Sequence, residues 1–245
     1  MTHNSNAGWK DRRLFENEAC VVINKLPGES SEIIASEAGS AAGKPCFLVH
    51  RLDMPVSGCL LLAKNPRAAA LLSEAFRRGD GSVTKKYRAI AEMPGTPAGS
   101  ADLHSLPGEA ELIHWLYEDK KRNKSFAAPF MDSCGKELPP PGRGRIKPQK
   151  AVLRYRLAGK GDHYLFFEID LVTGRHHQIR AQLSAIGLHI KGDLKYGARR
   201  SEKNGGIKLH AFSLAFPDPL KPDCKIEVKA MPPVMDALWE AFAKL

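Results

Sequence analysis

The chain has 245 residues, enough for one or two domains and for a core that needs neither disulfides nor a structural metal. Its 43% hydrophobic and 26% charged residues are ordinary for a globular chain. The apolar run Cys59–Ala63 falls far short of the ~20 residues of a membrane span, and the polar segment 1–13 lacks a signal-peptide core. Five scattered cysteines without a Cys-x-x-Cys pair fit a reducing compartment. Membrane, collagen-like, disordered and secreted disulfide-rich classes are excluded, and a cytoplasmic location is expected.

The charge balance favours a polyanionic partner. Lys and Arg number 37 against 27 Asp and Glu, which gives a net charge of +10. A basic surface attracts phosphates at long range and releases their counterions on contact. Many basic proteins bind no nucleic acid, so the charge alone only favours such a partner.

The first ninety residues alternate between short apolar strands and polar turns. A helix is expected from the Asn65-Pro66 cap to Gly79, with Ala69, Leu72 and Phe76 at helical spacing. Strands are expected at Glu18–Lys25, Cys46–Val49, Gly58–Ala63 and Thr84–Glu92.

Beyond Glu92 the pattern dissolves into proline, glycine and charge. The segment Asp119–Lys150 holds nine Lys or Arg, three Asp or Glu and five prolines. We expect a poorly ordered basic insertion on the surface, either a solvated face or an arm that folds onto a phosphate backbone.

Regular structure resumes after the insertion. A helix is expected to begin at Thr173-Gly174 and end at Gly187, with Ile179, Leu183 and Ile186 on one face. A closing helix is expected over Pro232–Lys244. Strands are expected at Ala151–Leu157, His163–Leu171, Leu209–Phe216 and Lys225–Lys229. Many strands with few helices indicate an α+β fold with a mixed or antiparallel sheet. We expect a polar tail over residues 1–14 and one domain over 15–245.

The loop His50–Gly58 is the first candidate for chemistry. It follows an apolar strand and places Asp53 beside Arg51 and a turn-forming glycine. Loops held by rigid strands often carry catalytic side chains. Taken alone, an Arg-x-Asp sequence is more typical of an ordinary surface turn.

The segment Thr173–Arg180 is the second candidate. On the expected helix, His176 and Arg180 stand one turn apart and present a cation that could keep a carboxylate ionised. A solvent-exposed polar face is the alternative. A metal site made of His176, His177 and Asp53 is disfavoured, because adjacent helical side chains diverge by roughly 100°.

Six short motifs in one order carry a family resemblance. The loop around Asp53 matches H-R-L-D-x-x-T-S-G except that Val56 replaces the threonine. The other five are Val22–Gly28 (V-x-N-K-P-x-G), Lys85–Ala89 (K-x-Y-x-A), Gly174–Arg180 (G-R-x-H-Q-I-R), Ile190–Gly197 (I-x-G-D-x-x-Y-G) and Leu209–Ala211 (L-H-A). Together they resemble the RluA-type pseudouridine synthases over residues 15 to 230, apart from the basic insertion.

The resemblance implies a pseudouridine synthase catalytic fold and an enzyme that isomerises uridine in ribosomal or transfer RNA. It makes Asp53 the essential carboxylate, Arg180 its opposing cation and Tyr87 a stacking and proton-transfer group. It makes Leu209 the apolar cover of the base and Arg51 the residue that fills the gap left by the flipped uridine. The remaining predicted RNA-binding residues are His50, Arg175, His177 and Gln178. Because no redox change or net hydrolysis occurs, no cofactor and no metal are implied.

The departures from the motifs are few. Leu26 precedes Pro27 where Lys-Pro is common, Asp218 replaces a frequent histidine, and His176 stands where threonine or serine is frequent. The start of the chain leaves no room for the small upstream RNA-binding domain of some relatives, and the absence of an exposed heptad favours a monomer. Two alternatives stay open: a catalytically silent RNA-binding module, and a metal-dependent nuclease built on the histidines and Asp53.

Overall fold

A computed structural model of the chain describes residues 9–93, 106–131, 136–138 and 147–245. The chain divides into two compact units, and each unit combines segments that are distant in the sequence. The first comprises 1–86, 204–206 and 210–235, and the second comprises 87–203, 207–209 and 236–245. The expected single domain over 15–245 stays a prediction.

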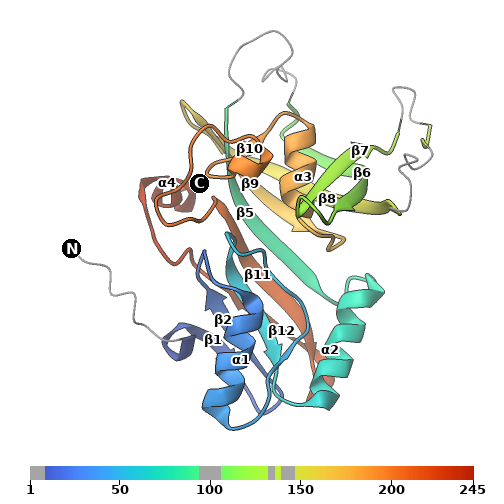
Figure 1. Cartoon of the computed structure of the whole chain (residues 1–245), viewed down its shortest axis with the longest axis vertical. Coiled ribbons are helices and arrows are strands. Elements are labelled where there is room, and N and C mark those ends of the chain that lie inside the picture. The colour runs from blue at the N-terminus through green and yellow to red at the C-terminus, as the bar shows by residue number, and fades with distance from the viewer. Residues whose placement is uncertain (1–8, 94–105, 132–135, 139–146) are drawn as a thin grey trace. The chain divides into compact units, whose positions relative to one another are not determined.

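The first unit combines five whole β-strands, parts of two more and two α-helices (Figure 1). In chain order its elements are the 3-10 helix η1 (Trp9–Arg12), β1 (Arg13–Glu16), β2 (Cys20–Lys25), α1 (Ser31–Ala42), β3 (Phe47–Leu48), β4 (Ser57–Ala63), α2 (Pro66–Arg78), β11 (Leu209–Asp218, from His210 on) and β12 (Lys221–Lys229). Residues 9–14 of the expected polar tail therefore form η1 and the start of β1, while residues 1–8 lie outside the described residues.

The sheet of the first unit runs in the order β1-β2-β4-β11-β12, with β3 added to the end of β4. β4 pairs antiparallel with β2 and parallel with β11, where Gly58 lies opposite Ala211. Gly58 has φ +117°, and a Cβ there would lie 2.3 Å from the carbonyl oxygen of Ala211. Only glycine fits this close approach, which fixes where the loop before β4 ends.

The core of the first unit lies between β4 and α2. Cys59, Leu61 and Ala63 alternate along β4 and pack with Ala68 and Leu72 of α2. Asn65 caps α2 by accepting a hydrogen bond from the Ala68 N–H, and Gly79 ends the helix at φ +66°. The expected helix and its strand neighbours are confirmed.

Helix α1 was not expected from the sequence. Its apolar periodicity is weak, because only one of its buried residues has a large apolar side chain. The buried residues are Ser31, Ile34, Ala35, Ala38 and Gly39. The capping signals were present. Ser30 accepts hydrogen bonds from the N–H groups of Glu32 and Ile33, and Gly43 ends the helix with φ +65°.

The second unit has a sheet in the order β5-β9-β8-β6-β7, with β10 on β5. Its elements are β5 (Thr84–Glu92, from Tyr87 on), β6 (Glu109–Asp119), β7 (Lys124–Pro129), β8 (Gln149–Lys160), β9 (Tyr164–Leu171), α3 (Gln178–Ala185), β10 (His189–Ile190), the 3-10 helix η2 (Leu194–Tyr196) and α4 (Ala237–Ala243). The pairs β6–β7, β6–β8 and β8–β9 are antiparallel. The strands expected at Thr84–Glu92, Ala151–Leu157 and His163–Leu171 are confirmed.

The expected loss of regular structure between Glu92 and Lys150 is wrong in part. β6 and β7 form a hairpin there, in register from His114 opposite Pro129 to Asp119 opposite Lys124. β6 has Glu109, Glu111 and Asp119 on one face and Glu118 on the other, which obscured its two-residue period, and the basic turn after it suggested a loop. The Pro139–Pro141 run and Cys134 lie outside the described residues.

Both late helices differ from expectation. α3 begins at Gln178 rather than at Thr173, and α4 begins at Ala237 rather than at Pro232. Pro232 and Pro233 disfavour helical backbone before them, and Asp236 instead caps α4 by accepting from the Trp239 N–H. Trp239 and Phe242 then pack on Ile90 and Phe166.

The observed sheets confirm the α+β class. Antiparallel pairs predominate, β4–β11 is parallel, and few helices accompany the strands. Among the described residues, no helix combines the length and apolarity that a membrane crossing needs.

Candidate active site

His50 anchors the loop that carries Asp53. Its ring stacks on Phe76 of α2, with centroids 4.8 Å apart, and its Nε2 accepts a hydrogen bond from the Leu61 N–H at 3.0 Å. Burial, with a smaller contribution from the charge of Lys85, lowers the pKa of His50 to about 3. The ring is therefore neutral at physiological pH and ties the loop to β4 and α2. Direct RNA binding by His50 stays a prediction.

Asp53 lies between two anchored neighbours in the loop. The buried Leu52 donates its N–H to the Ser31 hydroxyl at 3.2 Å, and that hydroxyl donates to the Leu52 carbonyl at 3.1 Å. The Asp53 carbonyl accepts from the Val56 N–H at 3.0 Å and closes a turn. The carboxylate itself is half-buried. The backbone on both sides is thus held in place, as a catalytic carboxylate requires.

Lys25 lies under the same loop and was not singled out from the sequence. Its side chain is fully buried, and its Nζ donates to the carbonyls of Leu26 at 2.9 Å and Met54 at 3.1 Å. The Gly28 N–H donates to the same Met54 carbonyl at 2.7 Å. Burial lowers the pKa of Lys25 to about 8, although the charges of Glu29 and Asp53 oppose that shift. Lys25 is the lysine of the V-x-N-K motif, so the motif could have identified it as a residue of the site.

Arg51 points away from this buried framework. Its guanidinium is exposed and pairs with the exposed Glu32 at 3.0 Å. An exposed pair of this kind is worth at most about 1 kcal/mol, so a phosphate can readily replace Glu32.

In the second unit, the turn before α3 corrects the expected helix start. His177 is the N-cap at φ +52°, and the Gln178 Oε1 accepts from the Arg175 N–H at 3.0 Å and the Thr173 hydroxyl at 2.8 Å. The Gln178 amide donates to the Val152 carbonyl of β8 at 3.0 Å. His176 therefore precedes the helix, and the expected one-turn spacing of His176 and Arg180 is wrong. Gln178 organises the turn, while its predicted contact with RNA stays a prediction.

Arg180 is buried and bound by a carboxylate that the sequence reasoning did not assign. Its Nε and Nη2 donate to the two carboxylate oxygens of Asp193 at 2.7 and 2.8 Å, and its Cζ lies 4.9 Å from the Tyr196 ring centroid. Both charged side chains are nearly inaccessible, at 5% and 1%. Asp193 uses two of the five guanidinium N–H donors. The acid of the I-x-G-D motif was the available signal.

Tyr196 links this pair to the β6–β7 hairpin. Its hydroxyl accepts from the Ser125 N–H at 2.8 Å and donates to the Ser125 carbonyl at 3.0 Å. His177 Nδ1 lies 3.1 Å from the same hydroxyl. The rings of His176 and His177 stack at 3.8 Å, so the expected divergence of the two side chains is also wrong. No three His, Cys, Asp or Glu side chains within the described ranges are grouped to hold a metal ion.

Tyr87 and Leu209 complete the predicted site residues. Tyr87 is buried in β5 and Leu209 is buried at the start of β11. Asp53 belongs to the first unit, whereas Tyr87, Arg180 and Leu209 belong to the second. The pairing of Asp53 with Arg180 therefore stays a prediction.

Comparisons with known proteins identify the family. Residues 21–185 match the family model described as RNA pseudouridylate synthase. The chain belongs to the RNA pseudouridylate synthase family, which isomerises uridine in RNA. An uncharacterised RNA pseudouridine synthase from Zymomonas mobilis is 34% identical over 83% of this chain and 86% of its own length. The tRNA pseudouridine synthase C of Haemophilus ducreyi is 32% identical over 93% and 92%. The human RNA Pseudouridylate Synthase Domain Containing 4 has the same fold, with TM-score 0.68, 23% identity and coverage of 96% and 93%.

Lys25→Met should change how stability depends on pH. Between pH 8 and 10.5, the lysine is deprotonated in the folded chain but protonated in the unfolded chain, so raising the pH favours folding. The wild-type free energy of unfolding should therefore rise relative to that of the variant, by on the order of 3 kcal/mol. Urea denaturation across this range measures the difference, with the exposed Lys44→Met as control. A parallel pH dependence in wild type and Lys25→Met would contradict the assignment.

Asp193→Asn should destabilise the fold by about 3–5 kcal/mol, because it removes the charge of a buried carboxylate that is paired with the buried Arg180 guanidinium. Chemical denaturation measures the loss, and Asp170→Asn on the exposed face of β9 is the matched control. A loss no larger than that of the control would show that Arg180 is neutralised by another group.

Proposed function

We propose that this chain converts specific uridines of ribosomal or transfer RNA to pseudouridine in the cytoplasm, acting as a monomer with Asp53 as the essential carboxylate. The reaction breaks the bond between ribose C1′ and uracil N1, rotates the base and joins C1′ to C5. The proton on C5 leaves, N1 gains one, and no electrons are exchanged. The chemistry therefore needs a carboxylate and proton transfer but no cofactor or metal.

The construction of the Asp53 loop is the observation that supports this role most directly. Leu52 is fixed by Ser31, and Met54 is fixed by Lys25 and Gly28. A carboxylate between two fixed residues reaches the ribose or the base in one geometry, which catalysis requires. Asp53 can act as a nucleophile at the ribose or the base, or as the base that removes the C2′ proton.

Arg180 is proposed as the cation that keeps Asp53 ionised in the closed site. Asp193 accepts two of its N–H donors, so the guanidinium plane is fixed, and a guanidinium has five N–H donors in all. One arginine would then be shared between a structural and a catalytic carboxylate. The buried Asp193 pairing supports this proposal because it orients the guanidinium before RNA arrives.

The base must leave its stack before it can react, at a cost of a few kcal/mol that is smallest in RNA loops. The exposed Arg51 is proposed to enter the gap left by the uridine, and Tyr87 and Leu209 to enclose the base. Arg175, His177 and Gln178 are proposed to complete the RNA-facing side of the turn before α3.

A catalytically silent RNA-binding module would bind RNA without making pseudouridine, and a metal-dependent nuclease would lose activity in EDTA. Carbodiimide-stop sequencing of RNA from a deletion strain distinguishes an active synthase from a silent RNA-binding module. The pseudouridines that are missing in the deletion strain also identify the substrate RNA. Full activity of the purified chain in EDTA would exclude the second alternative.

Asp53→Asn should fold, bind RNA and make no pseudouridine, because the substitution keeps size and polarity but removes the charge. Turnover should fall well below a hundredth of wild type, beyond the ~10²-fold effect of an auxiliary group. Pseudouridine formation, measured by carbodiimide-stop sequencing, tests this. Residual turnover above about a hundredth would overturn the assignment.

Tyr87→Ala should lose more activity than Tyr87→Phe, because phenylalanine keeps the ring that stacks on uracil. Loss of stacking corresponds to roughly 5- to 100-fold in binding. Any loss of turnover in the phenylalanine variant, at saturating RNA, measures the contribution of the hydroxyl to proton transfer. Full activity of both variants would show that Tyr87 is outside the site.

A further inference from the structure

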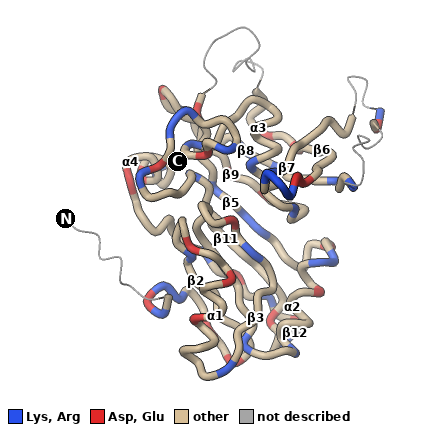
Figure 2. Tube along the Cα trace, in the orientation of Figure 1, with Lys and Arg blue, Asp and Glu red and all other residues tan. Residues whose placement is uncertain are grey.

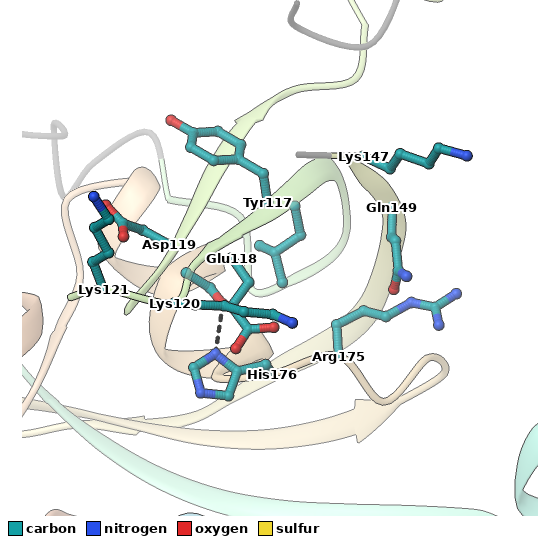
Figure 3. Close-up of a pocket in the computed structure, with 11 residues that line it drawn as sticks. Tyr117, Glu118, Asp119, Lys120, Lys121, Lys147, Gln149, Arg175 and His176 are labelled. Atoms are coloured by element: carbon teal, nitrogen blue, oxygen red, sulfur yellow. Dashed lines mark hydrogen bonds between the residues drawn. The ribbon is translucent and has the colours of Figure 1, made fainter. Parts of the chain in front are cut away.

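The second unit contains a hollow of about 570 Å³ beside the turn that leads to α3 (Figure 3). Its walls come from the β6–β7 hairpin, from the chain that enters β8 and from the turn before α3. The lining residues are Leu116, Tyr117, Glu118, Asp119, Lys120, Lys121, Ser125, Lys147, Gln149, Arg175 and His176. Neither Asp53, Tyr87 nor Arg180 is among these described residues.

The register of the sheet explains the polar floor of the hollow. Leu116 lies opposite Gln149, and Glu118 lies opposite Ser125. Directly opposed residues point to the same side of a sheet, and residues two apart on one strand share that side. These four side chains therefore share one face, where the Ser125 hydroxyl lies 2.9 Å from Nδ1 of His176. The floor thus offers a carboxylate and an amide that can form hydrogen bonds.

The rim is cationic. No described carboxylate forms an ion pair with Lys120, Lys121 or Lys147, and the Arg175 Nε donates weakly to a backbone carbonyl at 3.4 Å. Figure 2 shows Lys and Arg gathered at the β6–β7 turn, and Figure 3 shows Lys147 and Arg175 on the side of the hollow away from Lys121. Cations on both sides of a hollow suit a phosphodiester chain that passes through it.

Two other lysines of this region, one in β7 and one in β8, lie over aromatic rings. Lys124 Nζ lies 4.9 Å from the Tyr196 ring centroid, and Lys150 Nζ lies 4.4 Å from that of Phe130. The exposed Arg122 is paired with Asp119 at 3.7 Å, a contact worth at most about 1 kcal/mol that a phosphate can replace. Among the described residues, the cations of this region therefore differ: Lys124 and Lys150 lie over aromatic rings, whereas Lys120, Lys121 and Lys147 face the hollow.

His176 supplies a rigid flat ring at the edge of the hollow. Its Nδ1 is bonded to Ser125, its Nε2 lies 3.1 Å from the Asn123 Oδ1, and its ring stacks on His177. A ring held by two hydrogen bonds and one stacking contact loses little freedom when a base stacks on it. Histidine is among the side chains on which unpaired RNA bases stack.

We propose that this hollow binds one nucleotide of the single-stranded RNA substrate other than the uridine that reacts; the inference rests on the proposed function. The phosphates lie on Lys120, Lys121, Lys147 and Arg175, and the base stacks on His176 with its edge toward Glu118 and Gln149. The volume falls in the range of about 300–1,000 Å³ typical of small-molecule sites. Arg175 and His176 directly precede the helix of Arg180, so RNA held here continues along the predicted active-site motif.

Removal of the rim cations tests the phosphate contacts. The probe is a fluorescein-labelled single-stranded oligouridylate, followed by fluorescence anisotropy at several salt concentrations. Lys120→Ser with Lys121→Ser should weaken binding and flatten the slope of log affinity against log salt by about 1.4, or ~0.7 for each phosphate contact. The control removes the same charge from the exposed Lys160 and Lys203. Equal slopes in the two double variants would overturn the proposal.

Substitution of His176 tests the base contact and separates it from a structural role. His176→Ser should weaken oligouridylate binding by roughly 5- to 100-fold, whereas His176→Phe keeps the ring and should retain most of the affinity. Inorganic polyphosphate, which has no bases, should bind both variants like wild type. His163→Ser at an exposed position is the control. If phenylalanine weakens binding as much as serine, His176 only holds the hairpin and the base contact is refuted.

Two further outcomes bear on the proposal. Binding of uridine 5′-monophosphate as tightly as the oligouridylate would assign the hollow to a free nucleotide and overturn the RNA assignment. The binding assays do not depend on catalysis. Full turnover of Asp53→Asn would refute the proposed catalytic role of Asp53 and leave the nucleotide site in the hollow testable. RNA binding by the hollow variants equal to that of their controls would refute the nucleotide site and leave the proposed activity unaffected.

Discussion

The buried ion pair of Arg180 and Asp193 is the interaction on which the second unit depends. A guanidinium that is 5% exposed would be costly without an opposite charge, and Asp193 supplies one through two short hydrogen bonds. Tyr196, three residues after Asp193, places its ring on the guanidinium and its hydroxyl on both backbone groups of Ser125. One short segment thus orients the predicted catalytic arginine and also fixes the edge strand of the hairpin.

The first unit uses a buried cation in a different way. Lys25 has two backbone carbonyls as acceptors, so its burial is only partly compensated, and its pKa falls to about 8. Burying the Lys25 ammonium lowers the stability of the fold, but its hydrogen bond to the Met54 carbonyl fixes the residue next to Asp53. The loop is therefore rigid, as a carboxylate held in one geometry requires.

The sequence predicted the strands and α2 well, because each had strong periodicity or caps, as Asn65 and Gly79 illustrate. It failed where local signals were weak or misleading. α1 has few large apolar residues, and β6 carries charged residues on both faces. The start of α3 is set by the Gln178 side chain, which bonds back to Thr173 and Arg175 and holds the turn open. The motifs contained both Arg180 and Asp193 but did not pair them, since the pairing depends on a fold that brings residues thirteen positions apart together.

The basic hairpin shows why net charge alone is a poor guide to RNA contacts. Lys124 and Lys150 lie over aromatic rings, so these two cations already have favourable partners in the absence of RNA. Moving them onto a phosphate would forfeit those contacts. Within the part of the chain that the structure describes, Lys120 and Lys121 have no ion-pair or aromatic partner, so they gain the most from a phosphate. The salt dependence of RNA binding should therefore reflect the few cations that line the hollow rather than the total charge of the insertion.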